Sequence, residues 1–239
     1  MLRPLLRKPR AAAGNGRSGR AAEERVYHAI VDAIHGHRLA PGMRLGEREL
    51  AELLEVSRAT VRASLARLGH SQLVELRPNR GAIVASPSVD ETRGLFEARR
   101  VIESAIVRRL AGSLTRAKRD RLRAFIAEEQ KAYERGDLKS GQRLSIQFHQ
   151  VLAELAGNAV FERFMSELIA RTPLLALAHR GARLAYCGAH EHAAVVKALA
   201  AGDGERAAAL MIAHLRSLEN QLRLEKPATP ATLAEALQA

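Results

Sequence analysis

The chain has little cysteine and no long apolar run, and both deficits restrict what it can be. Its 239 residues include one cysteine, Cys187, which excludes an internal disulfide framework and fits a reducing compartment such as the cytoplasm. No segment approaches the roughly 20 unbroken apolar residues that cross a bilayer, so we expect a soluble cytoplasmic protein with no membrane partner. Residues 1–20 lack acidic side chains, and their apolar runs are too short for a secretory signal. We expect them to form a flexible basic arm.

The formal net charge is +12, but its position along the chain is more informative than its size. Residues 21–87 contain nine basic and eight acidic side chains, so net charge does not mark this part as a nucleic-acid binder. The order of charges does. Within residues 57–68, Arg58, Arg62 and Arg67 occur without any acidic residue, and arginines four residues apart share one face of a helix.

The first part of the chain predicts three helices followed by a β-hairpin. Apolar residues at helical spacing predict helices over residues 21–35 and 47–54, and Ser57 can act as the N-cap of a third. Two short apolar stretches, 73–76 and 82–84, flank a turn that contains glycine, which is typical of a hairpin. A helix, a short turn and a second helix followed by such a hairpin form a winged helix-turn-helix.

The remainder of the chain predicts only helices. A linker at Ser86-Pro87-Ser88 precedes it, because proline disfavours helix at the residue before it. About six or seven helices follow, with breaks near Gly112, Gly136, Gly157, Thr172-Pro173, Gly188 and Gly202. The fold class is therefore mainly α, an N-terminal winged helix-turn-helix followed by an all-α bundle. The expected units are an arm (1–20), a DNA-binding domain (21–86), a helical effector-binding and dimerisation domain (87–226) and a flexible tail (227–239).

The start of the third helix carries the candidate DNA contacts. A helix-turn-helix protein inserts its second helix into the major groove, where arginine reads guanine and serine or threonine bonds phosphates or base edges. The first turns of this helix contain Ser57, Arg58, Thr60 and Arg62. Spacing alone leaves an alternative open, in which these arginines form an ordinary solvated face of a structural helix.

Residues 41–84 closely resemble the winged helix-turn-helix of the GntR family of bacterial transcription regulators. The resemblance includes the Pro-Gly turn, the pattern ExELAExL, the segment VSRxxVRxxLxRL and the wing sequence NRGAxV. It implies that Arg48, Arg58, Arg62 and Gly81 occupy positions that contact the DNA operator. Arg80 in the same wing is a further candidate.

Two positions depart from the pattern of that family. Ala59-Thr60 stands where a Thr-Pro pair is common, which can alter base preference. Gln72 replaces the usual glycine before Leu-Val, so we expect Gln72 to adopt a backbone conformation that suits glycine, at a cost of about 1 kcal/mol.

Three histidines lie on or beside apolar helix faces in the second part of the chain. His192 shares a helical row with Val195, and His214 shares one with Leu218, while His149 neighbours Phe148. A buried imidazole needs partners for both ring nitrogens, and several converging imidazoles commonly bind a divalent transition metal such as zinc. For a single histidine, a hydrogen-bonded core residue is the more usual interpretation.

Residues 90–220 resemble the FCD domain, the metal-binding effector domain of the FadR subfamily. The resemblance rests on LFEARRVIE, FHQVLAELAGN, EHAAVVKALAAGD and ALMIAHL, in the order of the family. It implies that His149, His192 and His214 are metal ligands. The family's fourth ligand, an aspartate four residues before the first histidine, is Ser145 here, and a neutral hydroxyl is a poor zinc ligand. The site would then hold a metal with three histidines plus water or effector, or would be a metal-free histidine pocket.

Arg99 is a further candidate for the effector site. It shares an apolar helical row with Leu95 and Ile102, and a guanidinium on such a row must find an anion. That anion is either the carboxylate of Glu103, four residues on, or a ligand. Because the family commonly senses small organic acids, Arg99 together with the three histidines is predicted to capture a small carboxylate effector.

These patterns predict a homodimeric transcription regulator, a repressor in preference to an activator, rather than an enzyme. The helical domains would pair and set two recognition helices about one DNA turn apart. A metal-dependent hydrolase is one alternative, since three histidines with an open position also describe a hydrolytic zinc site. The sequence argues against this alternative, because it contains no HExxH motif, no nucleophile elbow and no recognisable general-base carboxylate. An architectural DNA-binding protein without a ligand is another, supported only by the basic arm.

Overall fold

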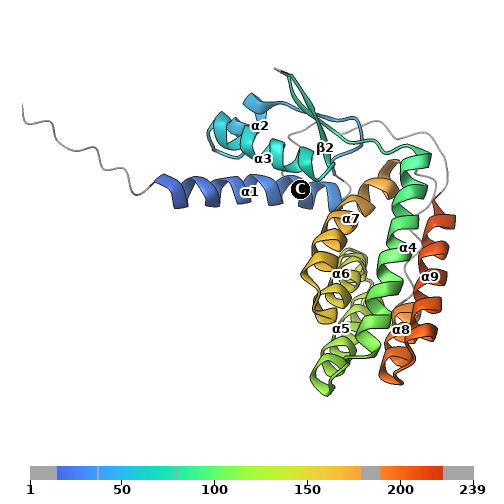
Figure 1. Cartoon of the computed structure of the whole chain (residues 1–239). Helices are drawn as coiled ribbons and strands as arrows, with labels where there is room; N and C mark the ends of the chain where they lie inside the picture. The colour runs from blue at the N-terminus through green and yellow to red at the C-terminus, as the bar shows by residue number, and fades with distance from the viewer. Residues whose placement is uncertain (1–14, 37, 79, 179–188, 223–239) are drawn as a thin grey trace, which may run out of the picture.

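The computed structural model describes residues 15–36, 38–78, 80–178 and 189–222 (Figure 1). Most of the predicted arm, the predicted tail over 227–239, the break predicted near Gly188 and Cys187 lie outside the described residues. A winged helix-turn-helix part and a helical bundle follow one another along the chain, which confirms the predicted fold class. No helix among the described residues combines the length and the hydrophobicity needed to span a bilayer.

The winged part consists of three helices and a small antiparallel sheet. Its elements are α1 (Asn15–His35), β1 (Arg44–Leu45), α2 (Glu47–Leu53), α3 (Arg58–His70), β2 (Val74–Arg77) and β3 (Gly81–Val84). The strand order is β1-β3-β2, with Val74 opposite Val84 and Arg44 opposite Ile83. The predicted helices and hairpin are confirmed, whereas β1 was not predicted, because a two-residue strand has too little alternation to be recognised.

Local sequence explains where α3, the helix predicted to contact DNA, begins. The hydroxyl of Ser57 accepts a hydrogen bond from the backbone N–H of Thr60, so Ser57 is the N-cap of α3 as predicted. Val61, Leu65 and Leu68 then recur at helical spacing and are buried in the core of the winged part. Their burial fixes the opposite, polar face of α3 toward solvent.

Gln72 adopts the conformation predicted for a residue that replaces glycine. Its φ angle is 56°, in the left-handed region, just after the end of α3. Glu55, between α2 and α3, has a φ of 52° and was not predicted to be unusual. A side chain in this region costs backbone energy, so both turns are held by the packing around them.

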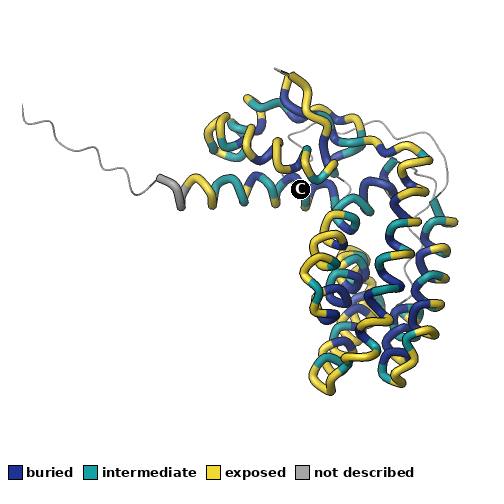
Figure 2. Tube along the Cα trace, in the orientation of Figure 1, coloured by how far each residue is buried: buried dark blue, intermediate teal, exposed yellow. Residues whose placement is uncertain are grey.

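Six helices form the bundle among the described residues, within the predicted range. They are α4 (Val89–Ala111), α5 (Arg116–Glu134), α6 (Leu138–Ala156), α7 (Ala159–Ala178), α8 (Ala189–Ala200) and α9 (Gly204–Gln221). Ser88 and Glu91 form a reciprocal capping box that begins α4 directly after the linker. Helix α4 packs along α9, and the inner faces of the helices are buried while their outer faces are exposed (Figures 1 and 2).

The break predicted at Thr172-Pro173 is wrong, because α7 continues through Pro173 to Ala178. Proline removes one backbone hydrogen bond and disfavours helix at the residue before it. Leu174, Leu175 and Leu177, which follow it, are all buried. Burial of these three side chains, worth about 1.5 to 3 kcal/mol each, outweighs the loss of one hydrogen bond.

The described residues form two hydrophobic cores. The core of the winged part contains Val26, Ile30, Leu50 and Leu65, and the core of the bundle is built from α4 to α9. Leu174 is an exception to the division by sequence, since it lies in α7 of the bundle but is buried in the winged core. Helix α7 therefore reaches the winged part, where it packs against α1 (Figure 1).

Candidate functional sites

The three predicted histidines converge inside the bundle. His149 lies on α6, His192 on α8 and His214 on α9, and each is at most 3% exposed. One ring nitrogen from each histidine lies within 4.8 Å of those of the other two. The structure therefore brings together residues that are up to 65 positions apart in sequence into one buried cluster, which we call the histidine cluster.

Each imidazole of the histidine cluster is oriented by a carboxyl group of its own. The Nδ1 atoms of His149, His192 and His214 lie 2.5, 2.9 and 2.7 Å from carboxyl oxygens of Glu103, Glu129 and Glu191, respectively. A carboxylate accepts the hydrogen of an N–H donor, so this arrangement protonates Nδ1 and leaves the lone pair on Nε2. Metal-binding histidines are commonly held in this way, with the second nitrogen donating to a carboxylate.

The inward-facing nitrogens are close to one another. The Nε2 atoms of His192 and His214 are 3.3 Å apart. Two lone pairs at this distance repel each other, so the pair requires a cation between them or a proton on one of them. The three carboxylates and the guanidinium of Arg99 give the surroundings a formal charge of −2 when the imidazoles are neutral. A divalent cation would neutralise it.

For two of the three pairs, His149 with Glu103 and His214 with Glu191, the pKa shifts favour a neutral imidazole beside an ionised carboxylate. Burial lowers the pKa of His149 to about 3, despite the opposing attraction of Glu103. Burial alone would raise the pKa of Glu103, but the charge of Arg99 and the contacts with His149 outweigh it and lower this pKa to about 2. Burial also lowers the pKa of His214, and the hydrogen bond from His214 lowers that of Glu191. Neutral imidazole is the form that binds metal.

Arg99 is buried beside the histidine cluster, where it pairs with Glu103. Its Nε donates to Oε1 of Glu103 at 2.7 Å, and its Nη1 donates to Oγ1 of Thr172 at 3.3 Å. Of the two alternatives raised by the sequence, the intrahelical ion pair is present. The direct contact of Arg99 with an effector stays a prediction.

Ser145 lies one helical turn before His149 on α6, at the position of the aspartate in the family pattern. It is 4% exposed, and its hydroxyl has no hydrogen-bond partner among the described residues. A buried hydroxyl without a partner is unfavourable. The hydroxyl of Ser145 could therefore form a hydrogen bond with a water molecule or a ligand bound beside it.

Sequence reasoning missed Glu129 and Glu191 and considered Glu103 only as the partner of Arg99. A signal for Glu129 was present, because Leu122 and Ile126 precede it at helical spacing and predict a buried position. Glu191 gave no such signal. It lies next to His192 in sequence but bonds His214, a pairing that depends on how α8 and α9 pack.

The predicted DNA contacts at the start of α3 lie on the surface of the winged part. The side chains of Arg58 and Arg62 are 64% and 66% exposed, and both pair with Glu47 at the start of α2. Nε and Nη2 of Arg62 bind the two carboxylate oxygens of Glu47 at 3.1 and 2.8 Å. The carboxylate of Glu47 is only 16% exposed, whereas the two guanidinium groups are mostly open to solvent. DNA binding through these arginines would require them to exchange Glu47 for phosphate or a base edge. Glu47 is a residue of this surface that the sequence did not single out.

The remaining predicted DNA contacts have different surroundings. Arg48 is 85% exposed and lies beside Glu52 on α2, and Arg80 is exposed at the wing. Gly81 is buried, with a φ of 79°, and a Cβ there would come within 2.2 Å of the carbonyl oxygen of Leu45. Glycine at 81 is therefore required by the approach of β1 to β3, and its contact with DNA stays a prediction.

Arg67, the third arginine of the basic stretch, faces α1 instead of the surface formed by Arg58 and Arg62. It donates to Glu24 at 2.8 Å, and its guanidinium lies 3.9 Å from the centre of the Tyr27 ring. These contacts with α1 give Arg67 a role in packing α3 within the winged part.

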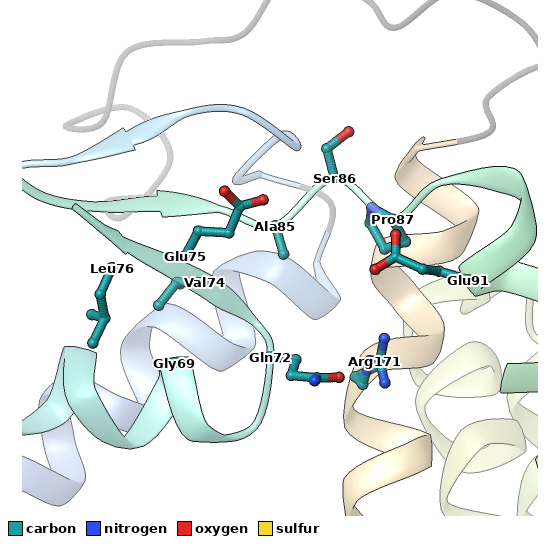
Figure 3. A pocket seen from close by; sticks show the side chains of 10 residues that line it. All are labelled: Gly69, Gln72, Val74, Glu75, Leu76, Ala85, Ser86, Pro87, Glu91 and Arg171. Atoms are coloured by element: carbon teal, nitrogen blue, oxygen red, sulfur yellow. The ribbon is translucent and has the colours of Figure 1, made fainter. Parts of the chain in front are cut away.

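A cavity of about 510 Å³ lies at the joint between the winged part and the bundle (Figure 3). Its lining includes Gln72 and Leu76 of the winged part, Pro87 of the linker, Glu91 of α4 and Arg171 of α7. None of the three clustered histidines lines it. The cavity is therefore separate from the candidate metal centre.

Two families of known proteins match the chain. Residues 94–217, just over half of the chain, match the FCD domain, and residues 22–84 match bacterial regulatory proteins of the gntR family. The first range includes all three clustered histidines, and the second includes the whole of α2, α3 and the wing.

Individual relatives agree with both matches. The HTH-type transcriptional repressor RspR of Escherichia coli (strain K12) is 31% identical over 133 residues, which cover 56% of this chain and 58% of RspR. The match thus spans little more than half the length of that relative. The HTH-type transcriptional regulator LutR of Bacillus subtilis (strain 168) is 27% identical over 214 residues, which cover 79% of this chain and 95% of LutR.

A solved structure has the same architecture over most of the chain. A GntR regulator from Rhodococcus sp. RHA1 superimposes with a TM-score of 0.73 at 28% identity, covering 84% of this chain and 97% of its own. The E. coli protein McbR/YncC shares the fold, with a TM-score of 0.70 at 20% identity over 83% of this chain and 93% of its own.

Proposed function

Because the chain belongs to the GntR family and carries an FCD domain, we propose that it is a DNA-binding transcription regulator controlled by a small organic acid. The observation that carries the proposal is the joining of two sites in one chain. An exposed basic helix start at Arg58 and Arg62 suits the major groove, and a buried histidine cluster suits a ligand. Because the two lie in different domains, ligand binding would change operator affinity at a distance.

The operator would be bound by the surface at the start of α3 and by the wing. Arg58 and Arg62 would read bases or phosphates, and Ser57 and Thr60 would bond the DNA backbone. Further contacts would come from Arg48, Arg80 and the backbone at Gly81. The name of RspR describes a repressor, and repression is the sign of control that we propose here.

The histidine cluster would hold a divalent transition metal such as zinc. The residues fit this role because one ring nitrogen of each converges on a common space, their Nδ1 atoms are held by carboxyl groups, and their surroundings carry a formal charge that the ion would balance. When bound, the metal supplies a Lewis acid with affinity for carboxylate oxygens. Ser145 would leave room beside His149 for such an oxygen, which an aspartate would otherwise occupy.

The effector would be a small carboxylate bound at the histidine cluster, with Arg99 as a second candidate contact. A direct contact would require Arg99 to exchange Glu103 for the carboxylate of the effector. Two copies of the chain would pair through their helical domains, residues 87–226, which follow the DNA-binding domains over residues 21–86. The dimer would work in the cytoplasm.

The two alternative functions have less support. The relatives are named as transcription regulators, which argues against a metal-dependent hydrolase. An architectural DNA-binding protein would have no use for a buried histidine cluster with three dedicated carboxyl groups. The proposed function includes this cluster, so we favour it over both.

An electrophoretic mobility shift assay with the DNA upstream of the gene, with and without small carboxylates, tests the proposal. The parent protein is expected to bind this DNA in preference to a scrambled sequence and to lose or gain affinity with one acid. Binding that ignores sequence and falls steeply with salt would support the architectural alternative instead.

A further inference from the structure

Helix α7 contributes side chains to both hydrophobic cores. Ile169 and Leu175 belong to the core of the bundle, whereas Leu174, between them in sequence, is fully buried in the core of the winged part. The imidazole of His35, at the end of α1, donates from Nε2 to the backbone carbonyl of Ala170, 3.4 Å away. Residues 170–174, which we call the α7 joint, therefore contact the core of the winged part directly.

The same joint is linked to the histidine cluster through Thr172 and two intervening side chains, Arg99 and Glu103. Its Oγ1 accepts a hydrogen bond from Nη1 of Arg99 at 3.3 Å and donates one to the backbone carbonyl of Leu168 at 3.2 Å. Arg99 also binds Glu103, which holds Nδ1 of His149. A continuous chain of hydrogen bonds thus runs from a candidate metal ligand to the α7 joint.

Two features allow the α7 joint to move. Pro173 has no N–H, so the carbonyl of Ile169 lacks its usual helical donor and the helix is less stiff here. On one side of the joint the cavity separates the two domains, with Gln72 and Arg171 facing each other across it (Figure 3). The joint is therefore packed against the winged core but open on another side, an arrangement that permits a small rotation.

We infer that Thr172 is a positioning residue that couples the histidine cluster to the core of the winged part. A change of ligand at the cluster moves Glu103 and Arg99, and the hydrogen bond from Arg99 to Thr172 transmits this movement to the α7 joint. Leu174 and Ala170 then shift against the winged core. The inference rests on the proposed function, because the cluster must change with its ligand for any signal to arise.

Hydrogen–deuterium exchange of the full chain, with and without Zn²⁺, tests the coupling. Thr172→Val removes the hydroxyl and keeps the shape of the side chain, whereas Thr172→Ser keeps the hydroxyl. Ser166→Ala removes an exposed hydroxyl from the same helix and is the control. Zinc is expected to slow exchange in α6, α8 and α9 of all four proteins. Zinc is also expected to slow exchange over residues 26–35 of α1 by about fivefold in every protein except Thr172→Val. About fivefold is the change in an equilibrium that corresponds to one buried hydrogen bond.

Equal protection of α1 by zinc in Thr172→Val and the parent would overturn the coupling while leaving the metal centre intact. If zinc protects no helix of the parent, the proposed metal centre is wrong. Exchange of the metal-free Glu103→Gln variant then tests the coupling without metal. This substitution frees Arg99 from its ion pair and is expected to change exchange in α1 only when Thr172 is present. A change that persists in the double variant with Thr172→Val, or no change in either protein, would overturn the coupling.

Discussion

His192 and His214 approach each other with their Nε2 atoms 3.3 Å apart, while the Nδ1 atom of each faces a carboxyl group. The two carboxyl groups orient both rings so that their lone pairs point at the same space. A cation in that space would turn a repulsion into an attraction. The carboxyl groups should therefore matter to metal affinity almost as much as the histidines do.

Glu129→Gln should weaken zinc binding by about 10- to 100-fold, the usual effect of losing such a partner. Glutamine keeps an oxygen that can accept the hydrogen of His192 but removes the negative charge that favours the cation. Competition with a chromogenic chelator measures the affinity. Glu128→Gln, at an exposed position of the same helix, is the matched control and should bind zinc as the parent does. Unchanged affinity in Glu129→Gln would refute the role of the carboxyl group.

Ser145→Asp should tighten zinc binding by about tenfold or more, because a carboxylate replaces an orphaned hydroxyl one turn from His149. Ser145→Ala is the control, and it should leave zinc affinity unchanged, since the hydroxyl is a poor ligand. The same chelator competition compares the three proteins. If Ser145→Ala weakened binding as strongly as Ser145→Asp strengthened it, the hydroxyl itself would be a ligand.

Gly81→Ala should destabilise the protein by about 2–5 kcal/mol, since a new Cβ meets the carbonyl of Leu45 and the residue has a positive φ. Gly42→Ala is the matched control, because Gly42 has a φ of 81° and open space around its Cβ position. It should cost only about 1–2 kcal/mol. Urea unfolding gives both free energies, and equal losses would show that the contact with β1 is unimportant.

Arg62→Ala should lower operator affinity by about tenfold or more, because one good arginine–base pair is worth about 1–3 kcal/mol. Fluorescence anisotropy with operator and scrambled DNA separates loss of specific binding from loss of general charge. Arg123→Ala, at an exposed position on α5, is the control for charge alone. An equal loss in the two variants would mean that Arg62 acts only through net charge.

Metal-free protein should lose stability as the pH falls from about 6.5 toward 3. The pKa of His149 is lowered from 6.5 to about 3, so in this range the unfolded chain binds a proton that the folded chain does not. Glu103, with its pKa lowered from 4.5 to about 2, acts in the same direction at lower pH. Urea unfolding at about pH 7.5, 6 and 5 should give falling free energies, with a smaller fall in His149→Gln. A flat profile in the parent would contradict this assignment.

Helical spacing predicted the inward direction of His192 and His214 and placed His149 beside an apolar face, but it did not predict the carboxyl groups that orient the three rings. His192 and His214 share rows with buried aliphatic residues, a local pattern that needs no tertiary information. Glu129 meets His192 across 63 positions of sequence, and only the packing of α5 against α8 creates that contact. Local periodicity therefore located the site, whereas its charge balance required the structure.

The joint between the domains was misjudged from sequence for a related reason. Pro173 is a local signal for a helix end, but Leu174 is buried in the winged core and keeps α7 continuous. At the turn between α3 and β2 the outcome was different. Gln72 departs from the family pattern at one position, and its positive φ followed from that departure alone. Local backbone conformation was thus predictable where a specific motif existed, and long-range packing was not.

The most direct test of the central claim is fluorescence anisotropy of the upstream DNA with zinc-loaded parent protein and His192→Ala. Small mono-, di- and tricarboxylates of two to six carbons are titrated into each complex. The parent should bind this DNA in preference to scrambled DNA, and one acid should change its Kd by about fivefold or more, typical of allosteric coupling. His192→Ala should bind the DNA but not respond. An equal response in both proteins, or no preference for the upstream DNA, would contradict the account.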